Sequence, residues 1–425
     1  MPLYLASNTD RSRETRLTDL ETRVLRIAVH DFVGHPFQFE LTRELAANGH
    51  IARHFFFSDY PGPKGDAQVR NADPAGYSVE PISLNRPYST AKFVKRGLSN
   101  LRYGAVASRR IGEFNPDVVL SGNTPIEAQG QLQRTAHLAG AAFVFWMQDF
   151  YSLAVKTLAS GRIPLVGGLI GNVYHHMEGR QLRASEEIVL ISEGFRSELG
   201  AFRLDESRIN VIPNWGALSE LPCRPRHNDW SRANGLNERF VLLYSGTLGM
   251  KHNPTLLLEL ADAFVDDAEV EIVVACAGSG ADLLSRALTY APRANLRMLP
   301  LQPIDQFPDV LGSADVMIGL LESDAGRFSI PSKVLSYLCA GRAVLLSAPE
   351  QNLAAQTVRE AEAGLVVGAS DPAAFVNAAK RLRADTALRQ RFASAGWAYA
   401  QAHFAIPKVA QRFISVLERA IARRR

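Results

Sequence analysis

The sequence predicts an α/β protein made of two doubly wound, Rossmann-like domains. The chain has 425 residues, which is too long for one ordinary domain and about right for two. Hydrophobic residues make up 47% and charged residues 21%, the balance of a globular protein. Short, nearly continuous apolar segments alternate with helical patterns in both halves, which is typical of parallel sheets covered by helices on both faces.

The N-terminal half starts this alternation after residues 1–23, which are polar and predict a mobile extension. Apolar runs predict strands at 24–29, 51–57, 117–122, 142–150, 187–192 and 209–214. Apolar side chains at helical spacing predict helices at 37–49, 93–114, 124–140 and 193–202. We therefore expect the N-terminal domain to span residues 24–215.

The C-terminal half repeats the pattern after residues 216–235, which contain two prolines and no periodicity and predict a linker. Strands are expected at 239–246, 270–278, 296–300, 315–321 and 364–368, with a helix and a further strand in 329–348. Helices should fill the intervals between these strands. The C-terminal domain should span 236–400, and residues 401–425 should form a closing helix with a basic tail.

Composition excludes several classes of protein. Three widely spaced cysteines indicate neither a disulfide framework nor a zinc cluster. No apolar run reaches the ~18 residues of a membrane span, and no signal peptide is visible, so we expect a cytoplasmic protein. The small net charge of +4 does not suggest a nucleic acid partner.

In open α/β sheets, ligands bind at the carboxyl ends of the strands. In the first domain the polar residues there are His30, Asp31, Gly34, His35, Asn123, Gln148 and Asp149. A carboxylate such as Asp149 can accept a proton or orient a sugar hydroxyl, and it can equally well cap a turn. The two histidines lack the further ligands that a metal site needs, so we expect no metal and no cofactor.

The second domain has the pattern of an anion site. Two glycines and Lys251 follow a strand in "SGTLGMKHNP", and "IPSK" places Lys333 in the first turn of a helix. Two anion sites close together suit a diphosphate. Each glycine taken alone is equally well explained as a residue that allows the chain to turn. The candidates are Gly246, Thr247, Lys251, Gly278, Ser279, Gly280, Glu322, Pro331, Ser332, Lys333 and Ser336.

Basic residues are concentrated between Pro81 and Gly112, where no acidic residue occurs, and three arginines end the chain. A solvated helix face is the ordinary explanation. Because the charges share one sign, we also expect contact with an anionic membrane surface, together with the apolar run 163–171. The residues involved are Lys92, Lys95, Arg96, Arg102, Arg109 and Arg110.

A series of segments carries a resemblance to a known family: "HDFVGHPFQFELTRELAANGH", "WMQDFYSLA", "VLISEGFRSEL", "VIPNWG", "LLYSGTLGMKHNP", "LQPIDQFPDVLGSADVMIGLL" and "IPSKVLSYLCAGRAVL". Because the segments occur in this order, the chain resembles retaining glycosyltransferases of family 4. The resemblance extends from about Val24 to about Ile421. These enzymes have the GT-B fold, two Rossmann-like domains facing across a cleft. The resemblance is to the envelope-polysaccharide branch that includes colanic acid and O-antigen transferases.

The resemblance implies metal-independent transfer of a sugar, with retention, from a nucleotide diphosphate sugar to a saccharide on polyprenyl diphosphate. The C-terminal domain would bind the donor and the N-terminal domain the acceptor. Lys251 and Lys333 match positions that contact the diphosphate, and Gly34 matches a loop that closes over the phosphates. With Asp149, the two lysines are the expected catalytic residues.

The chain departs from the family pattern where many members carry two glutamates eight positions apart. Phe328 and Ser336 stand at those positions, so we expect Glu322 or Asp324 to substitute. An epimerase or hydrolase of the same fold, and a degenerate transferase that binds nucleotide without turnover, stay open as alternatives. A bilobed solute-binding protein is disfavoured because no export signal is seen.

Overall fold

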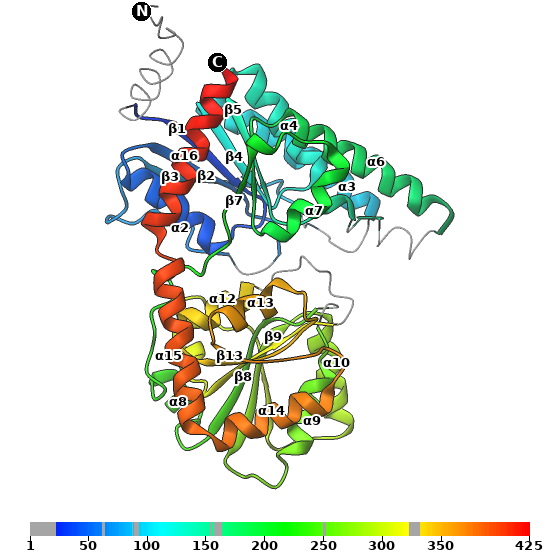
Figure 1. Cartoon of the computed structure of the whole chain (residues 1–425), viewed down its shortest axis with the longest axis vertical. Coiled ribbons are helices and arrows are strands. Elements are labelled where there is room, and N and C mark those ends of the chain that lie inside the picture. The colour runs from blue at the N-terminus through cyan, green and yellow to red at the C-terminus, as the bar shows by residue number, and fades with distance from the viewer. Residues whose placement is uncertain are drawn as a thin grey trace, which may run out of the picture. The chain divides into compact units, whose positions relative to one another are not determined.

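The computed structural model describes residues 23–61, 64–86, 88, 93–153, 155–156, 164–249, 252–322 and 332–425. The chain forms two compact units (Figure 1). Unit 1 comprises residues up to Ile212 together with Val409–Arg425, and unit 2 comprises Pro213–Lys408. The expected extension, residues 1–23, lies outside the described residues except for Arg23.

Unit 1 contains a parallel seven-stranded sheet in the order β3-β2-β1-β4-β5-β6-β7. The strands are β1 (Arg26–Asp31), β2 (Ile51–Phe57), β3 (Tyr77–Ile82), β4 (Val118–Gly122), β5 (Ala142–Met147), β6 (Glu187–Leu190) and β7 (Ile209–Val211). The helices are α2 (Pro36–Ala47), α3 (Phe93–Phe114), α4 (Ile126–Leu138), α6 (Pro164–Ala184), α7 (Arg196–Leu199) and α16 (Ile406–Arg424). Short 3-10 helices are η1 (Glu193–Phe195), η2 (Gly200–Phe202) and η3 (Glu206–Arg208).

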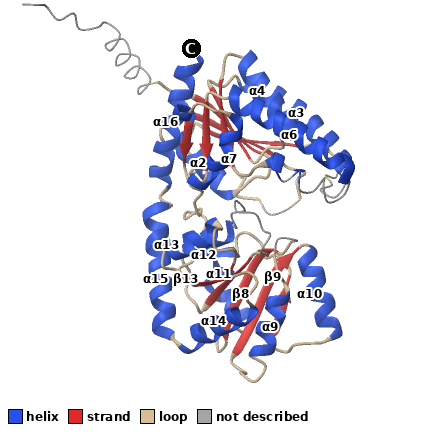
Figure 2. Ribbon diagram, turned by 45° about the vertical axis from the view of Figure 1, so that its right-hand side comes forward, coloured by secondary structure: helices blue, strands red, loops and turns tan. Residues whose placement is uncertain are grey.

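Helices cover both faces of this sheet (Figure 2). On one face, the Trp146 ring of β5 packs between Phe37 of α2 and Phe413 of α16, at centroid distances of 5.7 and 4.7 Å. On the other face, Tyr103 of α3 contacts the Phe57 ring of β2 at 4.7 Å. The central strands β4 and β5 are buried along their whole length, which explains their continuous apolar sequences.

Unit 2 contains a parallel six-stranded sheet in the order β10-β9-β8-β11-β12-β13. The strands are β8 (Phe240–Thr247), β9 (Val270–Ala277), β10 (Leu296–Leu299), β11 (Val316–Leu320), β12 (Ala343–Ser347) and β13 (Gly364–Val367). The helices are α8 (Asp229–Ala233), α9 (Thr255–Ala263), α10 (Ser279–Tyr290), α11 (Phe307–Gly312), α12 (Ser332–Cys339), α13 (Leu353–Glu360), α14 (Pro372–Ala384) and α15 (Thr386–His403). Leucines of α9 and Phe375 of α14 share one apolar core with the sheet.

The predicted fold class is confirmed, and the structure adds elements that the sequence did not reveal. The expected strands all form, but β3 was missed because Pro81 and polar residues interrupt its pattern. Its position at the sheet edge explains the tolerance for proline. The expected helix at 193–202 consists instead of η1, α7 and η2, and α6 was not predicted as a helix.

The unit boundary also differs from the expected domains. Residues 216–235, predicted as a linker, pack within unit 2, where Asn228 caps α8 and donates to the carbonyl of Asp309 at 2.9 Å. Residues 409–425 return to unit 1.

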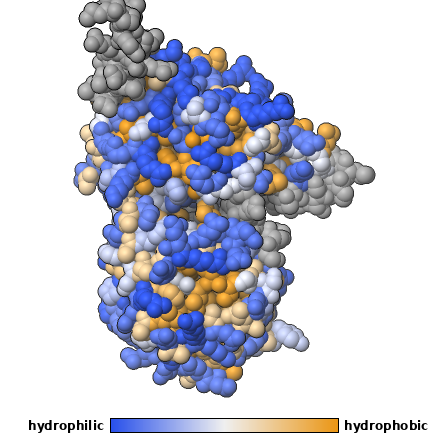
Figure 3. All heavy atoms as spheres, viewed as in Figure 1, coloured by the Kyte–Doolittle hydropathy of each residue, from blue (hydrophilic) through white to orange (hydrophobic). Residues whose placement is uncertain are grey.

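On the face shown in Figure 3, hydrophilic residues are spread over both units, with hydrophobic residues in smaller areas between them. In the described part of the chain, no helix has the length and apolarity required to cross a membrane.

Candidate functional site

In unit 2 the strand order reverses between β8 and β11, and predicted site residues lie at the ends of these two strands. Gly246 and Thr247 end β8, and Glu322 follows β11 by two residues. Lys333 is the second residue of α12. The structure therefore brings the predicted residues to the edge where open α/β sheets bind ligands.

Lys333 is half-buried and lies against Gly246. Its ammonium nitrogen is 5.5 Å from the centroid of the Tyr244 ring, a cation-π distance. Burial lowers the pKa of Lys333 to about 8, partly opposed by the Cys276 thiol, whose own pKa burial raises to about 11. The group is thus a cation near neutral pH that an incoming anion would stabilise.

His252 is a second polar side chain beside Lys333, and it was not among the predicted site residues. Its Nε2 is 3.3 Å from Lys333 Nζ. Its Nδ1 lies 2.9 Å from the amide nitrogen of Gly249 and 3.3 Å from the carbonyl oxygen of the same residue. The ammonium can donate to a phosphate oxygen, and the imidazole beside it can do the same when Nε2 carries a proton.

The loop after β9 is shaped by contact with Leu248. The amide of Gly280 donates to the Leu248 carbonyl at 2.8 Å, and a Cβ on Gly280 would be 2.8 Å from that oxygen. Gly278 has a φ of +112°, and a Cβ there would be 2.9 Å from the same atom. Packing against Leu248 thus accounts for both glycines. The Gly280 amide already donates to the Leu248 carbonyl, so it is not available to a ligand. Ser279 begins α10 and is exposed.

The remaining predicted donor residues divide into described and undescribed positions. Ser336 lies on α12, half-buried, three residues after Lys333, and Ser332 begins that helix. The predicted or discussed positions Lys92, Lys251, Asp324, Phe328 and Pro331 lie outside the described residues.

In unit 1 the strand order reverses between β1 and β4, and the loops after these strands meet. Asp31 is fully buried and accepts hydrogen bonds from the backbone of Val33 and of His35. Burial opposes its ionisation, but the charge and hydrogen bonds of His35 lower the pKa of Asp31 to about 2. Asn123, in the left-handed region at φ 50°, places its amide nitrogen 3.2 Å from His35 Nδ1. Asp31, His35 and Asn123 thus form one cluster, with Gly34 (φ +86°) in its loop.

His30 differs from the expected acceptor-side role because it is fully buried. Thr124 donates its hydroxyl proton to the Gly122 carbonyl, so it accepts from His30 Nδ1 at 2.9 Å. Tyr103 then donates to His30 Nε2 at 2.8 Å. Burial lowers the pKa of His30 to about 4, although the charge of Asp31 opposes this. The neutral ring is satisfied within the protein, so His30 joins β1, β4 and α3 and leaves no surface for a ligand.

A cavity of about 170 Å³ lies at the ends of β4 and β5 and brings together the predicted residues Asn123, Gln148 and Asp149. Glu178 of α6 also lines it, and the sequence analysis missed this residue. Glu178 accepts the hydroxyl of Ser152 and the amide of Tyr151, the latter at 3.0 Å. Burial raises the pKa of Glu178 to about 6, opposed by these hydrogen bonds and reinforced by the charge of Asp149.

Signals for the missed residues are present in the sequence. Glu178 lies four residues after Tyr174 and four before Leu182, so helical spacing places an acid on the buried stripe of α6. His252 directly follows the predicted Lys251 in a strand-to-helix loop.

Several arginines of the predicted basic surface and of the C-terminus are paired with acids. Arg109 and Arg110 of α3 lie 3.7 and 3.4 Å from Glu113. The C-terminal arginines pair within unit 1 as well, Arg423 with Glu187 at 2.6 Å and Arg424 with Glu186 at 3.4 Å. Lys95 and Arg102 of α3 are exposed.

Two family models match the chain. The model described as "Glycosyl transferase 4-like domain" matches residues 35–215, and that described as "Glycosyl transferases group 1" matches residues 227–398. A search of curated proteins finds the "Putative colanic acid biosynthesis glycosyl transferase WcaI" of Escherichia coli (strain K12). It is 22% identical over 330 residues, which cover 73% of this chain and 78% of that protein.

Solved structures share the fold. Anabaena Alr3699/HepE, in complex with UDP and glucose, has a TM-score of 0.67 and 14% identity, covering 92% of this chain and 99% of that chain. Sucrose-phosphate synthase from Thermosynechococcus elongatus has a TM-score of 0.67 and 13% identity, covering 91% and 96%. WaaG, a glycosyltransferase involved in lipopolysaccharide biosynthesis, has a TM-score of 0.66 and 13% identity, covering 92% and 99%. Together with the two family models, these similarities place the chain among the family 4 glycosyltransferases of the GT-B fold, in the branch that includes colanic acid transferases.

Proposed function

We propose that this glycosyltransferase transfers a sugar, with retention and without a metal ion, from a nucleotide diphosphate sugar to a saccharide carried on polyprenyl diphosphate. The observation that carries the donor part of the proposal is the Lys333 ammonium in unit 2, which lies 3.3 Å from His252 Nε2 and against Gly246 at the end of β8. The ammonium can neutralise charge on a departing diphosphate, which is the stabilisation that sugar transfer requires of the enzyme, and the imidazole can hydrogen-bond to the same group. HepE, bound to UDP and glucose, has the same fold and supports a nucleotide sugar as donor.

Unit 1 would hold the acceptor. Its cavity combines the exposed carboxylate of Asp149 with amide groups of Asn123 and Gln148, which suit the hydroxyl groups of a sugar. The similarity to the colanic acid transferase supports a role in polysaccharide synthesis. A prenyl-linked acceptor would place the reaction at the inner face of the cytoplasmic membrane.

The first experiment measures which nucleoside diphosphate stabilises the protein. A ligand bound only by the folded state at 100 times its Kd stabilises that state by about 2.7 kcal/mol. We expect one of UDP, GDP or ADP to raise the melting temperature, and the Lys333→Ala variant to lose this effect. If none of the three shifts the melting temperature, the proposed donor class is wrong.

The second experiment is a transfer assay with the matching nucleotide sugar and a short polyprenyl-diphosphate saccharide, with and without EDTA. We expect a product with the anomeric configuration of the donor, read by NMR, at a rate that EDTA does not change. An inverted product overturns retention, and inactivation by EDTA overturns metal independence. Sugar released to water without an acceptor would favour a hydrolase, an epimerised nucleotide sugar would favour an epimerase, and binding without turnover would favour a degenerate transferase.

We also propose that unit 1 contacts anionic lipid through α3. Leu98 and Leu101 on α3 are 51% and 46% exposed, beside the exposed Lys95. Such an amphipathic face can bind a bilayer surface by burying its leucines and attracting anionic lipid. Leu98→Asp with Leu101→Asp should abolish flotation with phosphatidylglycerol vesicles at low salt. Leu138→Asp, at an exposed leucine of α4, is the matched control, and equal binding by all three proteins rejects the proposal.

A further inference from the structure

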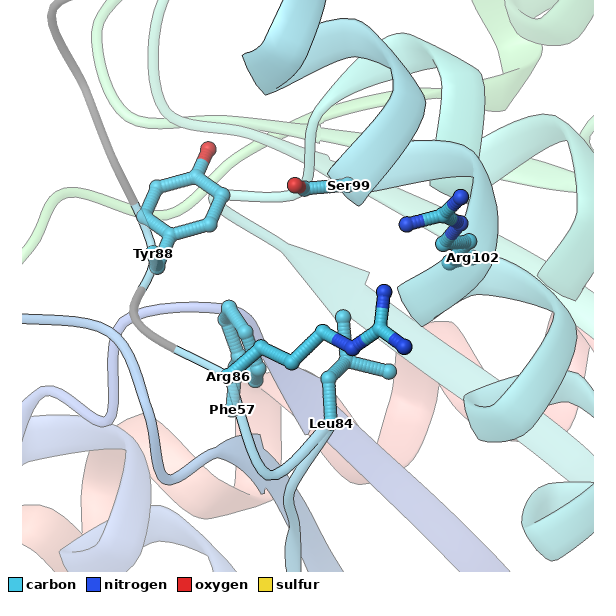
Figure 4. A pocket seen from close by; sticks show the side chains of 6 residues that line it. All are labelled: Phe57, Leu84, Arg86, Tyr88, Ser99 and Arg102. Atoms are coloured by element: carbon cyan, nitrogen blue, oxygen red, sulfur yellow. The ribbon is translucent and has the colours of Figure 1, made fainter.

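A second cavity of unit 1, of about 360 Å³, lies between the loop after β3 and helix α3 (Figure 4). Its lining residues are Phe57, Leu84, Arg86, Tyr88, Ser99 and Arg102. In Figure 4 the guanidinium groups of Arg86, from the loop, and Arg102, from the helix, point into the same space. The cavity is thus a small basic pocket, which we call the arginine pocket.

The charges of the two arginines are not matched by acids. In the described ranges, no salt bridge or side-chain hydrogen bond involves the guanidinium of Arg86 or Arg102. By contrast, Arg53 and Arg110 lie 3.1 and 3.5 Å from Glu80, and Arg109 lies 3.7 Å from Glu113. Two cations that face one cavity repel each other, and an anion bound between them would remove that repulsion.

The loop that carries Arg86 is held in place by Asp59. This carboxylate accepts hydrogen bonds from the Ser83 hydroxyl at 2.6 Å and the Leu84 amide at 2.7 Å. Burial opposes its ionisation, but these bonds and one from the Arg86 amide lower the pKa of Asp59. Asn85 adopts the left-handed conformation at φ 51° between them. The position of Arg86 is therefore built into the turn before any ligand arrives.

The other walls indicate what the anion is attached to. The rings of Phe57 and Tyr88 pack edge to face at 5.4 Å and form an apolar floor with Leu84. Outside the pocket, the exposed Leu98 is one helical turn before Arg102 on α3, so both lie on the same face of that helix. An anionic group on an apolar chain matches this combination of charges and apolar surface.

We propose that the arginine pocket binds the phosphate or diphosphate group of a prenyl-linked acceptor. Guanidinium forks bind phosphate oxygens in a bidentate manner, and two of them from opposite walls suit a diphosphate. Contacts also join the pocket to the place in unit 1 where the strand order reverses, between β1 and β4. The Phe57 ring contacts Tyr103, and the Tyr103 hydroxyl hydrogen-bonds to His30 near the end of β1. This inference rests on the acceptor proposed above and assigns its charged group to a subsite.

Binding is tested by titrating the full-length chain with farnesyl diphosphate, farnesol and inorganic pyrophosphate. All titrations use a Lys333→Ala background, because the cations of unit 2 would also bind pyrophosphate. Arg86→Ala with Arg102→Ala should weaken the binding of farnesyl diphosphate by about 100-fold or more, since the double variant loses at least two charge-assisted hydrogen bonds and each contributes about tenfold. Arg109→Ala, an exposed arginine of α3 paired with Glu113, is the control and should change nothing. Melting curves establish that each variant is folded.

The three probes separate the sources of the anion. Farnesyl diphosphate should bind more tightly than pyrophosphate, and farnesol should bind weakly and be insensitive to the arginine variants. Equal affinity for pyrophosphate and farnesyl diphosphate overturns the prenyl assignment. Farnesyl diphosphate binding that is unchanged in the double variant overturns the pocket itself. The double variant could instead lose binding to phosphatidylglycerol vesicles and keep its affinity for farnesyl diphosphate. That result would assign the arginines to a bilayer surface and would also overturn the proposal.

The outcome is separable from that of the proposed function. In a transfer assay the Arg86→Ala, Arg102→Ala protein with Lys333 intact should show a KM for the prenyl diphosphate acceptor raised by about 10-fold or more. The melting shift produced by the nucleoside diphosphate should be unchanged. If the wild-type protein transfers to no lipid-linked acceptor yet binds farnesyl diphosphate through the arginines, the proposed reaction fails and the pocket stands. If the double variant transfers the sugar with an unchanged KM for the acceptor, the proposed reaction is retained and the proposed role of the arginine pocket is rejected.

Discussion

The side chain of Lys333 crosses Gly246 so closely that a Cβ on Gly246 would lie 2.7 Å from Lys333 Cε. Gly246 also has a φ of +124°, a conformation that residues with side chains rarely adopt. The end of β8 is therefore shaped to let the lysine of α12 extend over it. This relationship links a glycine at the end of β8 to the cation of α12, 87 positions further along the chain.

Gly246→Ala should displace the Lys333 ammonium and lower transfer by about 10-fold or more, as removal of a well-placed donor does. The backbone strain at this φ should also destabilise the fold by about 1–3 kcal/mol. Gly249→Ala in the same loop is the matched control, because its Cβ would meet His252 Nδ1 only at 3.9 Å. In a double variant with Lys333→Ala, the glycine change should add little further loss of activity. Fully multiplicative losses would show that Gly246 acts independently of the lysine.

Lys333→Ala should lower kcat by about 10²-fold, the usual effect of deleting a group that stabilises developing negative charge. The melting temperature should not fall, because the substitution removes a cation whose charge burial disfavours. Steady-state kinetics and thermal melts measure the two effects. Lys333→Arg should recover part of the activity, and near wild-type turnover in Lys333→Ala would remove this residue from the mechanism.

The pH dependence of kcat/KM for the donor should report Lys333. Because burial lowers its pKa to about 8, the free enzyme loses the ammonium as pH rises through 8, and kcat/KM should fall there. A bound diphosphate favours the charged form, so kcat should stay level to higher pH. The arginine of Lys333→Arg keeps its charge, and its profile should lack the fall. The same fall in both proteins would assign it to another group.

Glu178→Gln should stabilise the protein at pH 7.5. The pKa of Glu178 is raised from 4.5 to about 6, so the folded state favours the protonated form. The associated stability is complete below pH 4.5 and is lost as pH rises through 6, a difference of about 2 kcal/mol. The neutral glutamine avoids this loss, so unfolding free energies of variant and wild type should differ at pH 7.5 and agree near pH 4.5. The exposed Glu238→Gln is the control, and an equal effect there would reject burial as the cause.

Unit 1 should lose stability when the pH falls from 8 to 5. Burial lowers the pKa of His30 to about 4 and that of His54 to about 3, so the unfolded chain binds protons that the folded unit does not. Each histidine should lower the stability at pH 5 by about 2 kcal/mol. Amide hydrogen exchange of β1 and β2 peptides measures this loss in unit 1.

His54→Phe provides the matched variant for that measurement. It keeps the stacking on Phe39, at 3.9 Å between ring centroids, and removes the titrating nitrogen. The pH-dependent loss should shrink by about 2 kcal/mol, the contribution of His54. A loss of unchanged size would show that other groups cause the acid sensitivity.

Much of the fold could be predicted because the spacing of apolar residues along a short segment indicates whether it forms a strand or a helix. The buried strands β4 and β5 are apolar without interruption, and α3 was predicted with the bounds that the structure has. β3 escaped because an edge strand needs neither continuous apolar residues nor every amide, so Pro81 is tolerated there. α6 escaped because its glycines and mixed polarity hide the buried stripe.

By itself, the sequence determined the class of the fold, the strand ends at which polar residues gather, and the lysine at the start of α12. Only the tertiary structure decided how those residues act, because burial and partners come from segments distant in the chain. His30, which ends a strand as a ligand-binding residue would, is enclosed by Tyr103 and Thr124 and stays neutral. Lys333 gains its lowered pKa and its neighbour His252 only when α12 packs beside β8. Arg86 and Arg102, 16 positions apart in a run of basic residues, become one pocket when the loop after β3 folds against α3, because charges cooperate by distance in space.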